Sequence, residues 1–267
     1  YRRSGPIMLS LRQIKSDAEV AQIKEAIRVT DIAFRRVLGF VRPGVTEYEV
    51  EAEITHEFLR NCMNGHAYSP IIASGKNSCV LHYVANSEPC KEGDVLLLDF
   101  GADYGNYAAD LTRTIPVSGK FSKRQRRIYD AVLRVMRGAM KLLKPGTIIQ
   151  QYHEAVGEMM TEELLNLRLL RKSDIKNQTK ERPAYKKYFM HGTSHHLGID
   201  VHDLGTRFDP IKPGMVFTCE PGIYIPEENI GIRIENDLLI TKNGNTDLMS
   251  MIPIEAEEIE GLMRSKK

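Results

Sequence analysis

Apolar residues recur at helical spacing in the first part of the chain. Between residues 16 and 40 they follow one another at intervals of about three to four, which predicts an amphipathic helix that Ser16 and Asp17 cap. Arg-Pro-Gly at 42–44 ends this helix, and residues 46–63 predict a second one. A loop-rich, strand-prone stretch then extends to about residue 90.

The rest of the chain alternates strand and helix patterns. Residues 91–117 favour two strands joined by a turn that contains glycine. Helices are expected from 122 to 143 and from about 148 to 170, with Lys-Pro-Gly between them. The charged segment 171–187 indicates a solvated loop, and strands are expected to dominate from 189 to about 241.

This order of elements repeats itself. Helix, basic residue, Pro-Gly and helix occur twice, with Pro43 and Pro145 in equivalent places. In the hairpins that follow, Lys91, Gly93, Val95, Asp99 and Gly101 share their spacing with Lys212, Gly214, Val216, Glu220 and Gly222. Each hairpin returns with a second acid, Asp110 or Glu235. We therefore expect one α+β domain whose two pseudo-symmetric halves bring four carboxylates to a central cleft.

Composition supports a globular protein and narrows its partners. The chain has 267 residues, of which 42% are hydrophobic and 27% charged, which excludes disorder and coiled coil for the whole. A net charge of +2 gives no support for nucleic acid or a membrane surface as the main partner. The four cysteines form no CxxC pair and are expected to be reduced thiols, as in a cytoplasmic enzyme.

The acids at the repeated positions stand where a strand should be buried. Asp99 follows an apolar run, as do Glu220 and Glu235, and Asp110 follows two alanines. Each acid alone is explained as well by a local salt bridge or a turn cap. Four carboxylates close together, however, cannot all ionise without a cation. Oxygen ligands combined with a histidine suit Mn²⁺, Co²⁺ or Zn²⁺.

The segment 191–203, HGTSHHLGIDVHD, holds four of the eight histidines. Neutral imidazole binds metal ions, and neighbouring histidines donate hydrogen bonds or move protons. His196 is expected to point away from the site, because adjacent strand residues face opposite sides. The remaining histidines His56, His66 and His153 are expected to be structural or surface residues. Motifs for nucleotide binding and for serine hydrolases are absent from the sequence.

From about residue 14 to 258 the chain resembles a known family, the two-metal peptidases of the pita-bread fold. These include aminopeptidase P, prolidase and methionine aminopeptidase. The motifs LLLDFG, AADLTRT, HGTSHHLGIDVHD, TCEPGIYI and GIRIEND occur in the family's order and spacing. The resemblance implies two divalent metal ions, with Mn²⁺ first and Co²⁺ or Zn²⁺ as alternatives. Their implied ligands are Asp99, Asp110, His195, Glu220 and Glu235.

The resemblance also implies a role for each ligand. Asp110 and Glu235 would bridge the two ions, and Asp99 would chelate one of them. His195 and Glu220 would hold the other ion, and Glu220 would also move a proton from water to the leaving nitrogen.

Further residues match the family's substrate-binding positions. VLHY at 80–83 is similar to the aminopeptidase P and prolidase branch, which implies that His82 contacts the peptide near the scissile bond. By the same match, His202 would hydrogen-bond the substrate carbonyl or the tetrahedral intermediate, and His191 would line the proline-side pocket. Arg233 would hold the bridging carboxylates. Tyr68 matches a position beside the ligands, although ordinary core packing explains it equally well.

The implied activity is that of a Xaa-Pro aminopeptidase, which releases the N-terminal residue of peptides with proline second. Prolidase, which cleaves Xaa-Pro dipeptides, is the nearest alternative. A catalytically silent peptide-binding module is the alternative from another class. We expect residues 14–267 to form the catalytic domain and residues 1–13 to be a lead-in from an N-terminal domain. A homodimer or higher oligomer is left open. Asn236, where relatives commonly have an acid, is expected to face away from the metals.

Overall fold

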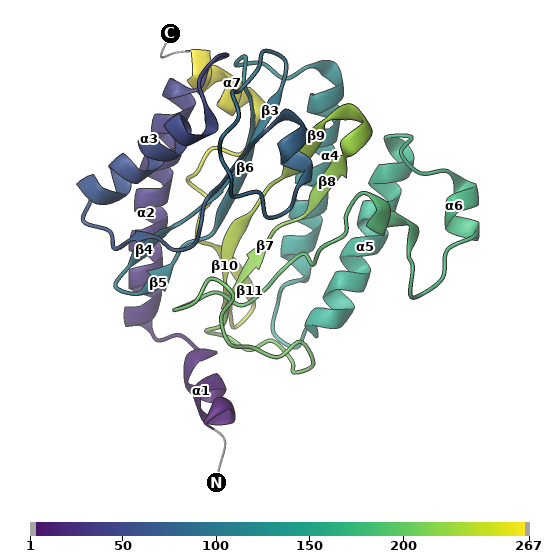
Figure 1. The fold of residues 1–267 in the computed structure, drawn as a ribbon. Helices are drawn as coiled ribbons and strands as arrows, with labels where there is room; N and C mark the ends of the chain where they lie inside the picture. The colour runs from purple at the N-terminus through teal and green to yellow at the C-terminus, as the bar shows by residue number, and fades with distance from the viewer. Residues whose placement is uncertain (1–3, 265–267) are drawn as a thin grey trace.

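Two pairs of helices lie on opposite sides of a group of antiparallel strands in the computed structural model, which describes residues 4–264 (Figure 1). The first pair, α2 and α3, comes from the first half of the chain, and α4 and α5 come from the second half. The helices are α1 (Gly5–Arg12), α2 (Asp17–Phe40), α3 (Glu47–Arg60), α4 (Lys123–Leu142), α5 (Ile149–Asn166), α6 (Lys172–Lys176) and α7 (Ala256–Arg264).

The helix pairs form where the apolar spacing predicts them. Ser16 is the N-cap of α2, and it exchanges side-chain and backbone hydrogen bonds with Glu19 in a capping box. Ser122 and Gln125 cap α4 in the same way. The apolar faces of these helices pack against the strands in one continuous core.

Every strand pairing is antiparallel. The strands are β1 (Gly65–His66), β2 (Ile71–Ser74), β3 (Val95–Phe100), β4 (Ala102–Tyr104), β5 (Tyr107–Ala108), β6 (Leu111–Pro116), β7 (Val216–Cys219), β8 (Gly222–Ile225), β9 (Ile230–Arg233), β10 (Asn236–Thr241) and β11 (Gly244–Asp247). They form the sheets β2-β3-β6, β11-β10-β7, β1-β4-β5 and β8-β9. An isolated bridge between Thr112 and Glu235 joins the two halves beside the site.

The hairpin of residues 91–117 is more broken than the sequence predicts. Instead of two strands it contains four, because the ladder is interrupted at Gly101 and again at Ala109 and Asp110. A Cβ atom on Gly101 would lie 1.7 Å from the carbonyl oxygen of Ala109, so the backbones approach too closely for a side chain there. The interruption lies beside both aspartates of the site.

Two segments also differ from their expected structure. Residues 189–215 contain no named strand, so the prediction that strands dominate from 189 is wrong for this first part. The histidine-rich segment within it is held by one isolated bridge, between His196 and Phe217, and by backbone hydrogen bonds to residues 216–220. The charged segment 171–187 contains the short helix α6 and a 3-10 turn at Ala184–Lys187 within its loop.

The internal repeat is visible in matching backbone hydrogen bonds. Gly44 N donates to Cys90 O at 2.9 Å, and Gly146 N donates to Ile211 O at 2.9 Å. Both glycines have a positive φ, of 96° and 87°, which only glycine adopts without strain. The two Pro-Gly turns are therefore equivalent in conformation and in partner.

Three observations concern the chain as a whole. All four cysteines are free thiols, as predicted. Across residues 4–264, no helix combines the length and the apolar composition needed to cross a membrane. Of the expected lead-in 1–13, residues 1–3 lie outside the described residues, and most of the remainder forms α1.

Candidate metal centre and substrate cavity

A cavity of about 520 Å³ opens where the two halves meet. Its wall includes every residue that the sequence singles out for the site. These are Tyr68, His82, Asp99, Asp110, His191, His195, His202, Glu220, Arg233 and Glu235. The remaining lining is largely apolar and includes Leu81, Val84 and Val201, so the acids stand in a cavity suited to a small organic ligand.

The acids reach the cavity from the strands of both halves. Asp99 lies in β3, whereas Asp110 lies in the interruption just before β6. Glu220 and Glu235 occupy the corresponding positions next to β7 and β10. The Thr112 hydroxyl donates to Glu235 Oε2 at 2.6 Å, and Glu235 N donates to Thr112 O. An acid of the second half is thus fixed directly to a strand of the first.

Tyr68 and Arg233 contact the acids of the first half. The Tyr68 hydroxyl oxygen lies 2.7 Å from Asp99 Oδ1 and 2.5 Å from Asp110 Oδ1. The buried guanidinium of Arg233 forms an ion pair with Asp99 and donates to the Tyr224 hydroxyl at 2.8 Å. Among the acids of the site, Arg233 therefore pairs with Asp99. The resemblance implies that it holds the bridging carboxylates Asp110 and Glu235 instead.

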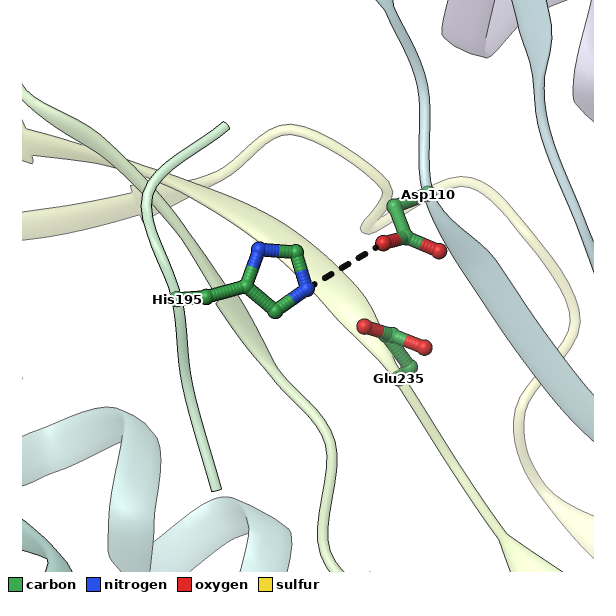
Figure 2. Close-up of side chains that lie close together, drawn as sticks. All are labelled: Asp110, His195 and Glu235. Atoms are coloured by element: carbon green, nitrogen blue, oxygen red, sulfur yellow. Dashed lines mark ion pairs between the residues drawn. The ribbon is translucent and has the colours of Figure 1, made fainter. Parts of the chain in front are cut away.

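The imidazole of His195 is oriented towards the acids. Its Nδ1 lies 3.0 Å from His196 O and donates to it, so that Nε2 is the nitrogen that faces the acids. His195 Nε2 lies 3.4 Å from Asp110 Oδ2 and 3.7 Å from Glu220 Oε1. Figure 2 shows the ring pointing to Asp110, with Glu235 beside it. This is the orientation that a metal-binding histidine needs.

The carboxylates are difficult to ionise together without a cation. Burial, with the charges of Asp110 and Asp99 as smaller causes, raises the pKa of Glu220 to about 7, against the attraction of His195 and Arg233. Burial and the neighbouring acids raise the pKa of Glu235 well above its usual range. Burial also raises the pKa of Asp99, although Arg233 opposes it. Charge repulsion of this kind indicates a site for positive charge.

The residues present fit a divalent metal ion. Ligand atoms of Asp110, His195 and Glu235 all lie within 4.8 Å of one another. Two carboxylates and one imidazole form a donor set that suits Mn²⁺, Co²⁺ or Zn²⁺. Burial alone would lower the pKa of His195, but Asp110 and Glu220 raise it to about 9. A cation in the same position would take over this pairing with the acids.

The other three histidines approach the same cavity from different directions. The ring of His202 lies 4.3 Å from that of His195. His191 Nε2 lies 2.8 Å from the Tyr224 hydroxyl, and its Nδ1 lies 3.6 Å from Glu220 Oε2. Burial and the charge of Arg233 lower the pKa of His191 to about 3, which keeps the ring neutral. His82 enters from the loop after the 3-10 turn Gly75–Cys79.

Three contributors to the site were missed by the sequence reasoning: Thr112, Tyr224 and Asp237. Thr112 binds Glu235, and Tyr224 joins Arg233 to His191. Asp237 is fully buried, and its Oδ2 accepts a hydrogen bond from Asp110 N at 3.1 Å. Thr112 follows Asp110 by two residues, and Asp237 follows Glu235 by two. Spacing of two on one face of a strand is the signal that marks Thr112 and Asp237.

The residues expected to face elsewhere do so. His196 is absent from the lining of this cavity, and its ring packs 4.2 Å from that of Phe217. Asn236 accepts a hydrogen bond from Arg113 and donates one to Asp247. His66 lies 2.8 Å from the Thr55 hydroxyl, in a structural position outside the cavity.

Two curated relatives from different bacteria carry the same name. The chain is 41% identical to a Xaa-Pro aminopeptidase of Haemophilus influenzae and 42% identical to one of Escherichia coli. Each match covers 97% of this chain but only 62% and 61% of the relative, respectively. The chain therefore spans about three-fifths of the length of these relatives.

The fold is also that of solved structures. Zinc-substituted aminopeptidase P of Escherichia coli, in complex with product, superimposes with a TM-score of 0.93 at 40% identity. The match covers 99% of this chain and 62% of that one. The expected α+β pita-bread fold is thereby confirmed. Residues 21–242 match the sequence model of metallopeptidase family M24, and the chain belongs to that family.

Proposed function

We propose that this chain carries the catalytic site of a metal-dependent Xaa-Pro aminopeptidase. The observation that carries the proposal is the convergence of all ten implied site residues on one cavity between the halves. The relatives named Xaa-Pro aminopeptidase, at 41% and 42% identity, support the same assignment. The substrates are peptides whose second residue is proline. Residues 14–267 are taken as the catalytic domain and residues 1–13 as its lead-in.

The proposal includes two divalent cations, with Mn²⁺ preferred over Co²⁺ and Zn²⁺. Asp110, His195 and Glu235 would hold them, with Asp99 and Glu220 completing the set. When bound, such cations make water a nucleophile at neutral pH and polarise the scissile carbonyl.

Glu220 is the residue suited to moving a proton. Its carboxylate lines the cavity, with Oε1 3.7 Å from His195 Nε2, so it can reach water and peptide bound there. Glu220 takes a proton from the attacking water and delivers it to the nitrogen of the departing proline. His191, 3.6 Å from Glu220 Oε2, stays neutral and holds the Tyr224 hydroxyl.

Two histidines bind the peptide around the bond that breaks. His202 hydrogen-bonds the carbonyl oxygen and stabilises its negative charge as the tetrahedral intermediate forms. His82, on the opposite loop, contacts the peptide near the scissile bond. The proline ring is fixed in shape and its amide lacks an N–H, so an apolar wall beside His191 can select it.

The four free cysteines are consistent with a reducing compartment, and we assign the protein to the cytoplasm.

Hydrolysis of Arg-Pro-Pro and of Ala-Pro with added Mn²⁺, each with an EDTA control, tests the proposal. Release of arginine that EDTA abolishes, with little cleavage of Ala-Pro, is the expected result. Preference for Ala-Pro would identify a prolidase instead. Failure to cleave either peptide, together with no Mn²⁺ binding in titration calorimetry, would overturn the enzyme proposal in favour of a peptide-binding module.

A further inference from the structure

A buried carboxylate that the mechanism does not use lies behind the loop that carries His82. Glu47, in the first turn of α3, is fully buried. Its Oε1 accepts hydrogen bonds from Ser74 N and Oγ, both at 2.8 Å, and from Asn77 Nδ2 at 3.1 Å. Its Oε2 accepts from Tyr83 Oη at 2.7 Å and from Glu88 N at 2.9 Å. Five donors therefore converge on one side chain.

The fold alone does not require an acid at this position. Glu47 lies four residues after Pro43, and the residue four after Pro145 in the second half is Ile149. Ile149 also starts its helix and is buried among apolar residues. The same helix start therefore forms with an apolar side chain. The need for Glu47 comes from the loop that it contacts.

The loop of residues 80–88 forms one wall of the cavity. Leu81, His82 and Val84 line the cavity, whereas Tyr83 turns to Glu47. The loop's ends are held separately: Val80 N donates to Asn77 O, and Asn86 accepts a hydrogen bond from Ile72 N. Within residues 4–264, the hydrogen bonds of the stretch 81–85 all involve the Tyr83 hydroxyl. This hydroxyl donates to Glu47 Oε2 and accepts from Ser87 N.

Apolar packing adds to this anchor without replacing it. Leu81 and Tyr83 pack against a small buried cluster, Ile71, Ala73, Leu97 and Tyr224. Packing is non-directional, so it permits the stretch to slide, whereas a hydrogen bond to a buried carboxylate fixes its position. Val84 on the same wall is 56% exposed, so solvent-facing contacts do little to hold the stretch.

We propose that Glu47 is a positioning residue, which fixes Tyr83 and thereby sets His82 for binding of the peptide. This inference rests on the proposed function, because His82 is taken to contact the substrate. Glu47 itself does not line the cavity. It acts through the Tyr83 hydroxyl on the cavity wall.

The variant Tyr83→Phe tests the inference, because it keeps the packed ring and removes the hydroxyl alone. We expect kcat/KM for Arg-Pro-Pro, with Mn²⁺, to fall about tenfold, mainly through a higher KM. The midpoint of thermal unfolding should fall by only a few degrees, because the other four donors to Glu47 remain. Tyr48→Phe is the matched control, since Tyr48 is an exposed neighbour of Glu47 on the same helix, and its kinetics should match the wild type.

A double-mutant cycle separates positioning from general loosening. In a His82→Ala background, Tyr83→Phe should have almost no further effect on kcat/KM, because the group that it positions has been removed. An equal loss in both backgrounds would overturn the inference. So would kcat/KM for Tyr83→Phe within about twofold of the wild type.

A spectroscopic readout keeps this test independent of the proposed activity. In histidine-labelled protein, the His82 ring resonance is identified by its loss in His82→Gln. Tyr83→Phe should shift and broaden that resonance and leave the His56 resonance unchanged. An unchanged His82 resonance would overturn the inference even in an active enzyme. Lack of both peptidase activity and Mn²⁺ binding in the wild type would overturn the proposed function, and the resonance would still decide whether the bond from Tyr83 to Glu47 sets His82.

Discussion

The two segments that carry the site histidines are fixed in different ways. The first, residues 80–88, carries His82 and is tied to Glu47 by neutral donors from its own half. The second, residues 191–204, is tied through Asp203, which lies next to His202. Lys15 Nζ lies 3.0 Å from Asp203 Oδ2, with both side chains 1% exposed, and Arg12 pairs with Oδ1. These two basic residues precede α2 in the chain and lie outside the repeated unit.

This difference separates two ways of holding an irregular segment. Neutral donors of fixed geometry satisfy a buried acid locally, with no second charge to desolvate. A buried ion pair must compensate the desolvation of both charges, so loss of either partner leaves an uncompensated charge. The second segment therefore depends on the residues that precede α2. The hydrogen bonds that tie the first segment to Glu47 come from its own half.

The largest expected effect is that of Asp203→Asn. It leaves the buried ammonium of Lys15 without its counter-charge, which should lower the free energy of unfolding by about 3–5 kcal/mol. Urea denaturation monitored by circular dichroism measures the loss. The double variant Lys15→Met with Asp203→Asn removes both charges and should regain part of it. A loss below about 1 kcal/mol for the single variant would contradict the importance of the ion pair.

Glu47→Gln should have a smaller effect. One carboxylate oxygen becomes an amide group that faces donors, so at least one buried donor loses its acceptor. We expect a decrease in unfolding free energy of about 2 kcal/mol, measured in the same urea assay. Glu49→Gln is a control on the same helix, where the side chain is exposed. If both variants lost the same stability, the Glu47 network would not be the anchor of the first segment.

The second segment should also make stability depend on pH through His153. Burial, with Arg207 and Lys186 as smaller causes, lowers the pKa of His153 to about 4. Its Nδ1 accepts a hydrogen bond from Thr193 N at 3.0 Å. Because the unfolded ring has a pKa of about 6.5, the unfolded state binds the proton first. Stability is thus full above about pH 6.5 and falls as the pH decreases towards 4.

At pH 5 the protonation of His153 in the unfolded state should lower the free energy of unfolding by about 2 kcal/mol relative to pH 7. The variant His153→Asn keeps an acceptor for Thr193 but does not titrate in this range. The free energy of unfolding of the variant minus that of the wild type should therefore increase when the pH is lowered from 7 to 5. Urea denaturation at both pH values measures this difference. An equal difference at the two pH values would show that His153 is not buried in its neutral form.

The smallest expected effect is that of Asp200→Asn. Asp200 pairs with Arg12 in the same cluster, but its side chain is 61% exposed. Water screens such a pair, so the loss should stay below about 0.5 kcal/mol. Comparison with Asp203→Asn in one denaturation series would show that burial, and not the number of ion pairs, decides how firmly the second segment is held.

Much of this architecture is predictable from the sequence because it depends on local patterns. The apolar spacing predicts α2 to α5, and the Pro-Gly turns predict the ends of α2 and α4. The repeated acids predict one shared cavity, and all of them line it. The irregular course of 189–215 was not predictable, because its ties to Lys15 and to His153 come from residues distant in the chain.

The anchoring residues escaped prediction for a related reason. Glu47 has the sequence signature of an ordinary acid in the first turn of a helix, where the helix dipole favours it. Only the folded chain brings Ser74, Tyr83 and Glu88 to it. Arg233 was predicted to reach the cavity, but its pairing with Asp99 depends on the contact between β3 and β9.

The matching Pro-Gly turns have an evolutionary consequence. A chain whose halves repeat the same turns, helices and hairpins is equivalent to a symmetric dimer joined into one polypeptide. Once the copies were joined, each position existed twice, and selection could act on one copy while the other kept its form. Aspartates at the first-half site positions and glutamates at the second, and Glu47 opposite Ile149, are such divergences. A cavity between two diverged halves can contact the two ends of one bound molecule with different side chains.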